Sequence, residues 1–134
     1  MSEKLSVLLV DDSRVVLTQL KILIADLDDV EVAGTARDGA AAIRLVAELK
    51  PDLVLMDLVM PGVDGMSALR LITAQHPDVQ VAVISSVGGT QSRAAEAFRL
   101  GAVQVLGKPF DAEILAALFE SVRRSLSRQQ EVRA

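Results

Sequence analysis

The sequence predicts an α/β fold, in which one five-stranded parallel sheet is covered by helices on both faces. Short apolar runs typical of strands alternate five times with segments whose apolar residues recur at helical spacing. Such alternation is typical of a parallel sheet with crossover helices. The 134 residues suit one domain. We expect a single domain over residues 1–134, with a core from about residue 4 to 127 and a frayed polar tail over 128–134.

The strands and helices follow from local patterns, taken in order. Strands are expected at residues 5–10, 30–36, 53–56, 79–85 and 102–106, and helices after Ser13, Asp38, Asp64, Thr90 and Asp111. Residues 30–36 alternate apolar and polar side chains, which is typical of a half-exposed edge strand. Pro51 and Pro77 end the second and third helices, and Gly101 ends the fourth.

Helical spacing also predicts which side chains of each helix face the sheet. We expect Val16, Leu20, Leu23 and Leu27 to face it from the first helix, Ile43, Val46 and Leu49 from the second, and Met66, Leu69 and Ile72 from the third. In the last helix the expected set is Ile114, Leu115, Leu118, Phe119, Val122 and Leu126.

Composition excludes several classes of function. The chain has no Cys, so it has neither disulfides nor thiolate metal sites. Its net charge of −4 and the absence of a basic block argue against direct nucleic-acid binding. No apolar run approaches the ~20 residues of a membrane span, and we expect a cytoplasmic protein without membrane insertion. His76 is the only histidine, and Tyr is absent, which excludes catalysis by a His pair or by Tyr.

The segment from residue 53 to 62 is the centre of the functional hypothesis. An apolar strand runs into Asp57, and Pro61-Gly62 turns the chain shortly afterwards. Ligands of open parallel sheets bind outside the carboxyl ends of the strands, at the point where the strand order reverses. In the doubly wound order 2-1-3-4-5 that point lies between the first and third strands. Asp57 is therefore a candidate reactive group, although an Asp in this position also suits a simple helix cap.

Other polar residues follow the remaining strands at the same edge. Asp11 and Asp12 follow the first strand, Ser85 ends the fourth and Lys108 follows the fifth. Three carboxylates and one ammonium leave a formal charge of −2. Two like charges about 4 Å apart repel by roughly 4 kcal/mol at an effective dielectric constant of ~20. Such a cluster needs protons or a cation, and carboxylate oxygens favour Mg²⁺ or Mn²⁺. An Asp nucleophile, a metal, a cation and a hydroxyl are the groups that phosphoryl transfer requires.

This set of residues resembles the receiver domain of bacterial response regulators, the phospho-accepting half of two-component signalling. The resemblance covers about residues 4–127 and rests on strand-Asp11-Asp12, on Asp57 followed by Met60-Pro61-Gly62, on Ser85 and on Lys108-Pro109. It implies a flavodoxin-like fold and phosphorylation of Asp57. It also implies that Asp11, Asp12, Asp57 and the backbone carbonyl of Val59 hold Mg²⁺, that Lys108 pairs with Asp57, and that Ser85 is the switch hydroxyl.

The resemblance implies a signalling role rather than an enzyme, apart from the domain's own phosphorylation and slow dephosphorylation. A histidine kinase or phosphotransfer protein would donate the phosphoryl group. An output partner, in a chemotaxis system or another phosphorelay, would bind the face of the fourth helix, fifth strand and fifth helix. Two alternatives remain open: a receiver fragment of a larger regulator, such as a chemotaxis methylesterase, and a metal-dependent phosphohydrolase that uses an aspartyl phosphate. The second usually needs an acid two residues after the nucleophile, where this chain has Val59.

Two departures from the resemblance concern the switch and the lifetime of the acyl phosphate. Many receivers carry an aromatic residue shortly before the conserved lysine, where this chain has Val105 and Leu106. Val59 and Val87 stand two residues past Asp57 and Ser85, and neither side chain can orient an attacking water by hydrogen bonding. The sequence therefore predicts a long-lived phosphorylated form.

Overall fold

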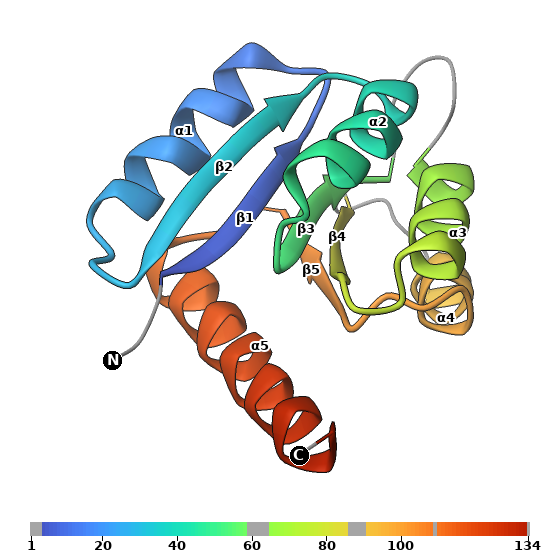
Figure 1. Cartoon of the computed structure of the whole chain (residues 1–134). Helices are drawn as coiled ribbons and strands as arrows, with labels where there is room; N and C mark the ends of the chain where they lie inside the picture. The colour runs from blue at the N-terminus through green and yellow to red at the C-terminus, as the bar shows by residue number, and fades with distance from the viewer. Residues whose placement is uncertain (1–3, 59–64, 86–90, 109, 134) are drawn as a thin grey trace.

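The computed structural model describes residues 4–58, 65–85, 91–108 and 110–133, and it has the predicted α/β architecture (Figure 1). Five parallel strands form one sheet in the predicted order, β2-β1-β3-β4-β5. The strands are β1 (Leu5–Val10), β2 (Val30–Ala36), β3 (Leu53–Asp57), β4 (Gln80–Ser85) and β5 (Gln104–Gly107). The helices are α1 (Arg14–Ala25), α2 (Gly39–Leu49), α3 (Gly65–Gln75), α4 (Gln91–Arg99) and α5 (Ala112–Arg133).

The helices cover the sheet in two layers, each with its own apolar core. One core joins α1 and α5 to the sheet, and its members include Leu9, Leu20 and Phe119. The other joins α2, α3 and α4 to the opposite face, through residues such as Val46 and Leu69. Because β1 and β3 contact both cores, their apolar runs are buried almost throughout. β1 and β3 therefore form a buried support for the residues that follow their carboxyl ends.

The predicted caps fix where the helices begin. The hydroxyl of Ser13 accepts the backbone N–H of Val16, and the carboxylate of Asp38 accepts that of Ala41. Asp111 caps α5 in the same way, through the N–H of Ile114. Each bond satisfies a donor that the first helical turn leaves without a partner. α1 thus begins two residues after Asp12 and α2 two residues after Arg37, so both turns at this edge are anchored by caps.

The end of α4 differs from the prediction for the fifth strand. That strand was expected from Ala102, but β5 begins at Gln104. The N–H of Ala102 instead donates to the carbonyl of Ala97, which closes the last turn of α4. Gly101, at φ +118°, allows this turn. A Cβ on Gly101 would lie 2.8 Å from Cγ2 of Thr73, so the turn packs tightly against α3.

The prediction for the buried face of α1 is only partly right. The buried residues are Leu17, Leu20 and Ile24, whereas Val16, Leu23 and Leu27 lie at the margin of the same core. Apolar residues occur on more than one side of this helix, so helical spacing alone did not define the centre of the stripe. Val15 and Ile22 are 65% and 63% exposed.

Two further predicted core residues are partly exposed. Leu49 of α2 is 39% exposed; one of its methyl groups lies 2.9 Å from the position of a Cβ on Gly34, so it covers the edge strand rather than the core. The centre of the α2 stripe consists of Ala42 and Val46, while Ile43 is partly buried. Ile114 is also 39% exposed, whereas the adjacent Leu115 is fully buried, so Ile114 lies at the margin of the buried stripe of α5. The remaining predicted residues of α5 contact the core.

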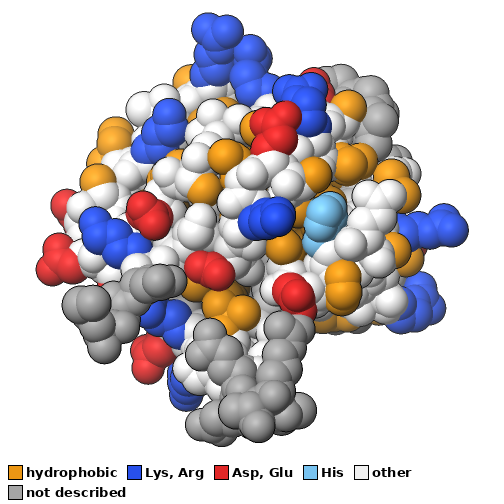
Figure 2. Space-filling model, viewed as in Figure 1, with side chains coloured by type: hydrophobic (Ala, Val, Ile, Leu, Met, Phe, Trp, Pro, Cys, Tyr) orange, Lys and Arg blue, Asp and Glu red, His pale blue; other side chains and the backbone are white. Residues whose placement is uncertain are grey.

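Three further observations complete the description. α5 extends to Arg133, so the structure has helix where the polar composition predicts a frayed tail; Arg, Gln and Glu are good helix formers. Across the described residues, no helix is long and apolar enough to cross a membrane. On the face shown in Figure 2, acidic and basic side chains are interspersed instead of forming one basic patch.

Candidate functional site

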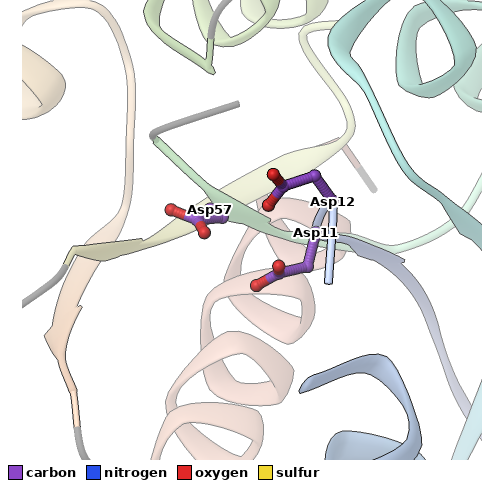
Figure 3. Close-up of side chains that lie close together, drawn as sticks. All are labelled: Asp11, Asp12 and Asp57. Atoms are coloured by element: carbon purple, nitrogen blue, oxygen red, sulfur yellow. The ribbon is translucent and has the colours of Figure 1, made fainter. Parts of the chain in front are cut away.

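The candidate site is built on the two central strands. Val10 of β1 pairs with Met56 of β3 in the parallel register. Asp11 follows Val10 and Asp57 follows Met56, so the two acids lie side by side at the same edge of the sheet. One carboxylate oxygen from each of Asp11, Asp12 and Asp57 lies within 4.8 Å of the other two. Figure 3 shows the three carboxylates pointing to the same side from the ends of these strands. The structure thus brings together the three acids that the sequence predicted.

Asp11 is the buried member of the cluster, with 1% of its surface exposed. Its N–H donates to the carbonyl of Ala36 on β2, and its Oδ1 accepts the N–H of Ser13. Its Oδ2 has no hydrogen-bond partner among the described residues and lies 3.9 Å from Nζ of Lys108, too far for a hydrogen bond. A buried carboxylate oxygen without a hydrogen bond is costly, and a cation at this position would relieve that cost.

The environment of Asp11 shifts its ionisation. Burial raises the pKa of the Asp11 carboxyl above its ordinary value, and the neighbouring charges of Asp57 and Asp12 act in the same direction. The hydrogen bond from Ser13 and the positive charge of Lys108 lower this pKa but do not compensate. The partners that the described residues supply therefore do not fully offset the burial of this carboxyl.

Lys108 is the cation that reaches the cluster. Its Nζ lies 3.3 Å from Oδ2 of Asp57, within hydrogen-bond geometry, and 3.9 Å from Oδ2 of Asp11. The N–H of Lys108 donates to the carbonyl of Ser85, which ties the residue to the end of β4. Lys108 keeps about 30% of its side chain exposed, whereas Asp57 keeps only 8%. The lysine thus approaches a largely buried carboxylate from the solvent side.

Ser85 stands at the same edge, one strand from the acids. In the register of β3 and β4, Asp57 pairs with Ile84, and Ser85 is the next residue. Ser85 is half-buried and pairs with Gly107 on β5. The predicted ligand Val59 and the segment with Val87 lie outside the described residues. Ser85, Lys108 and the three acids therefore share the carboxyl edge of the sheet, as the strand pattern predicts.

The sequence prediction missed one residue of this edge. Arg37 directly follows β2, and its Nη2 donates to the backbone carbonyl of Asp12 at 3.2 Å. The rule that placed Asp11 and Ser85 at the edge applies equally to Arg37, since it too follows a strand. Its side chain, however, points back to a peptide rather than to a carboxylate, and only the structure reveals that contact.

An apolar groove adjoins Lys108 on the α1 side of the molecule. It encloses about 420 Å³ and is lined by Val16, Gln19, Ile22, Leu23, Lys108 and Phe110. Ile22 is strongly exposed. The groove thus places exposed apolar surface next to Lys108, which in turn contacts Asp57.

Comparison with known proteins agrees with this geometry. A family model described as the response regulator receiver domain matches residues 7–120. The chain is 36% identical over 120 residues to chemotaxis protein CheY of Listeria monocytogenes, covering 89% of this chain and 99% of that protein. It is 41% identical over 103 residues to protein-glutamate methylesterase/protein-glutamine glutaminase 5 of Myxococcus xanthus, covering 77% of this chain and 30% of that protein.

Solved structures share the fold. The response regulator domain of Thermotoga maritima CheB superimposes with a TM-score of 0.81 at 33% identity, covering 93% of this chain and 98% of that chain. The receiver domain of the putative regulator NarL from Mycobacterium tuberculosis gives a TM-score of 0.84 at 29% identity, covering 90% and 98%. The five-stranded order of the sheet is the flavodoxin-like arrangement of these neighbours. The chain spans less than half the length of several curated relatives that it matches.

Proposed function

Since the chain belongs to the response regulator receiver domain family, we propose that it accepts a phosphoryl group on Asp57 and changes its binding surface in response. Receiver domains are signalling domains, and they interact with histidine kinases and output domains. The donor would be a histidine kinase or a phosphotransfer protein, in the cytoplasm. The observation that supports this proposal most directly is the contact of Lys108 with Asp57 at 3.3 Å, beside two further acids at the edge of the sheet.

The chemistry assigns one role to each residue. A carboxylate oxygen of Asp57 attacks phosphorus, the bond from phosphorus to the donor nitrogen breaks, and its electron pair leaves on that nitrogen. The product is an aspartyl phosphate. Lys108 already pairs with Asp57, and its ammonium then stabilises the charge on the phosphoryl oxygens. Ser85, at the end of β4, supplies a hydroxyl donor to the same oxygens.

The residues at this edge fit a divalent cation. Three hard oxygen ligands lie within 4.8 Å of one another, and the buried Oδ2 of Asp11 lacks a hydrogen bond among the described residues. Such a donor set favours Mg²⁺ or Mn²⁺. Asp11, Asp12, Asp57 and the backbone carbonyl of Val59 would hold it. When bound, the ion neutralises the acids and the incoming phosphoryl oxygens.

The proposed output face is that of α4, β5 and α5. Phe98 of α4 is 48% exposed and Val103, just before β5, is 42% exposed. Exposed apolar side chains of this size provide anchors for a partner. β5 ends beside them at Gly107 and Lys108 follows directly, so a movement at the phosphorylated edge has a short path to this surface.

Chemical phosphorylation tests the proposal. The protein is treated with acetyl phosphate and Mg²⁺, and the acyl phosphate is trapped with borohydride and mapped by mass spectrometry. We expect the adduct on Asp57 and its loss in Asp57→Asn. Asp28→Asn is the matched control, because Asp28 is exposed and lies in the turn after α1. Full labelling of Asp57→Asn would refute the assignment.

A second candidate concerns the context of the domain. We propose that the chain acts either as a CheY-like receiver or as the receiver of a larger chemotaxis regulator such as a methylesterase. The near-complete coverage of the Listeria CheY supports the first, and the match to the Myxococcus methylesterase supports the second. The genes beside this one would distinguish them: a methylesterase domain in the same reading frame supports the second. The phosphohydrolase alternative lacks support, because Val59 replaces the second acid.

A further inference from the structure

Asp12 is held differently from Asp11. Its side chain is exposed, yet one carboxylate oxygen stays within 4.8 Å of the other two acids. In the described part of the chain, the one hydrogen bond that involves Asp12 is the bond from Nη2 of Arg37 to its carbonyl, at 3.2 Å. Asp11, by contrast, has a backbone bond to Ala36 and a side-chain bond from Ser13.

The end of β2 and the turn that follows it therefore hold the backbone of both Asp11 and Asp12. The carbonyl of Ala36 accepts the N–H of Asp11, and the next residue, Arg37, donates to the carbonyl of Asp12. The Asp38 cap fixes the start of α2 immediately after Arg37. The guanidinium thus extends from an anchored backbone, although its own side chain is exposed.

We propose that Arg37 is a positioning residue of the metal site, which orients the Asp12 carboxylate by fixing the peptide from which it projects. This inference rests on the proposed function, because it assumes that Asp12 is a ligand of the cation. Mg²⁺ requires near-ideal octahedral geometry, so a ligand that rotates freely binds it poorly. Partners that orient metal ligands typically change metal affinity by about 10- to 100-fold.

The positive charge of Arg37 should weaken Mg²⁺ binding, whereas its positioning role should strengthen it. The direction in which Mg²⁺ affinity changes when Arg37 is replaced therefore tests the inference. A guanidinium near three carboxylates repels an incoming cation, so removal of its charge alone would strengthen Mg²⁺ binding. Because Arg37 is exposed, solvent screens this repulsion and the effect is small. A positioning role predicts weaker binding when Arg37 is removed, and a purely electrostatic role predicts tighter binding.

Titration of the protein with Mg²⁺ alone, by calorimetry, measures the affinity. We expect Arg37→Met, which keeps the aliphatic stem, to weaken Mg²⁺ binding by about tenfold. Arg37→Lys keeps a donor and the charge and should restore part of the loss. Arg44→Met is the matched control: Arg44 is exposed on α2 and has no described contact with the acids, so its loss changes net charge equally. It should leave the affinity within about twofold.

A second measurement separates positioning from general damage. The rate of labelling by acetyl phosphate is followed against Mg²⁺ concentration. Arg37→Met should raise the half-saturating concentration while the rate at saturating Mg²⁺ approaches that of the unmodified protein. Equal or tighter binding in Arg37→Met would overturn the inference and leave the proposed function intact. Absence of Mg²⁺ binding by the unmodified protein would overturn both.

Discussion

Asp11 combines burial with an incomplete set of partners, and this has a consequence for stability. Burial raises the pKa of its carboxyl in the folded protein above that in the unfolded chain. At a pH between these two pKa values, the folded protein therefore keeps a proton on Asp11 that the unfolded chain has released. Stability therefore falls as the pH rises through that window, starting from the pKa of an unperturbed Asp, about 3.9. Above the window, the ionised carboxylate of Asp11 destabilises the metal-free protein.

We accordingly expect Asp11→Asn to increase the free energy of unfolding of the metal-free protein at about pH 7, where Asp11 is ionised in the unfolded chain. The gain should shrink as the pH falls toward about 4. Urea unfolding at both pH values, followed by circular dichroism because the chain lacks Trp and Tyr, measures the difference. Asp28→Asn controls for the loss of one negative charge. A lower stability of Asp11→Asn at about pH 7 would contradict the expected cost of burying the ionised carboxylate.

At this scale the sequence predicted residue types but not their environments. Asp11, Asp12, Asp57, Ser85 and Lys108 were predicted to lie together, because each follows a strand of a parallel sheet. Which acid is buried could not be predicted, since the burial of Asp11 depends on how β2 and α1 pack around it. The contact of Arg37 depends in the same way on a side-chain direction that no spacing rule gives.

At the scale of the element, α5 shows where helical periodicity is informative and where it is not. Phe119 is 2% exposed, whereas Ile114 is 39% exposed although both belong to the predicted stripe. Since the adjacent Leu115 is fully buried, Ile114 lies at the margin of the stripe, and periodicity identifies the centre of a buried stripe better than its edges. Leu49 shows a different limit, because it lies in line with the buried Val46 but, at the end of α2, covers the edge strand β2 instead of the core.

This difference within one helix gives a stability prediction. Replacing a buried Phe by Ala typically costs about 3–5 kcal/mol, because it leaves a cavity as well as losing apolar burial. We expect Phe119→Ala to show a loss of this size in urea unfolding. Ile114→Ala, on the same helix, should change stability by less than about 1 kcal/mol. Similar losses for the two variants would mean that α5 does not dock on the sheet as described.

The exposed apolar side of α1 leads to a prediction about the phosphoryl donor. Ile22 is 63% exposed in the groove beside Lys108, and a donor protein that reaches Asp57 from this side would bury it. We expect Ile22→Ser to slow transfer from a purified histidine kinase by about tenfold, an effect of roughly 1.4 kcal/mol on the encounter. Labelling by acetyl phosphate, which needs no docking, should be unchanged.

Leu71→Ser provides the control for that experiment. Leu71 is 41% exposed on α3, which covers the opposite face of the sheet, so its loss removes a similar apolar side chain far from the groove. Equal slowing by both substitutions would show that the donor does not use the α1 groove.

At the scale of the whole molecule, the doubly wound order determines where the site lies. β1 and β3 are neighbours, although 42 residues separate the end of β1 at Val10 from the start of β3 at Leu53, and their carboxyl ends carry all three acids. The order could be predicted because five alternating strand and helix signals allow few arrangements. Which side chains are exposed could not be predicted, since exposure depends on the exact limits of each helical layer.

Binding of the cation should therefore stabilise the whole fold. A ligand that binds only the folded state raises the free energy of unfolding by about 1.4 kcal/mol at tenfold its Kd. We expect Mg²⁺ to raise the Tm of the unmodified protein in scanning calorimetry and to have little effect on Asp12→Asn. An equal rise in both proteins would indicate a general salt effect rather than a site.

The α1 and α5 core also has a consequence for how the chain is made. Leu5, Val7 and Leu9 of β1 leave the ribosome before the other strands, but they share their core with Leu115, Phe119 and Val122, which emerge after all five strands. The strand order permits β2, β1 and β3 to pair as soon as residue 57 is available. One face of that nascent sheet then remains partly uncovered until α5 has been made. A chain stopped at Phe110 should consequently aggregate, and chaperones that bind apolar surface should recognise it in preference to the finished protein.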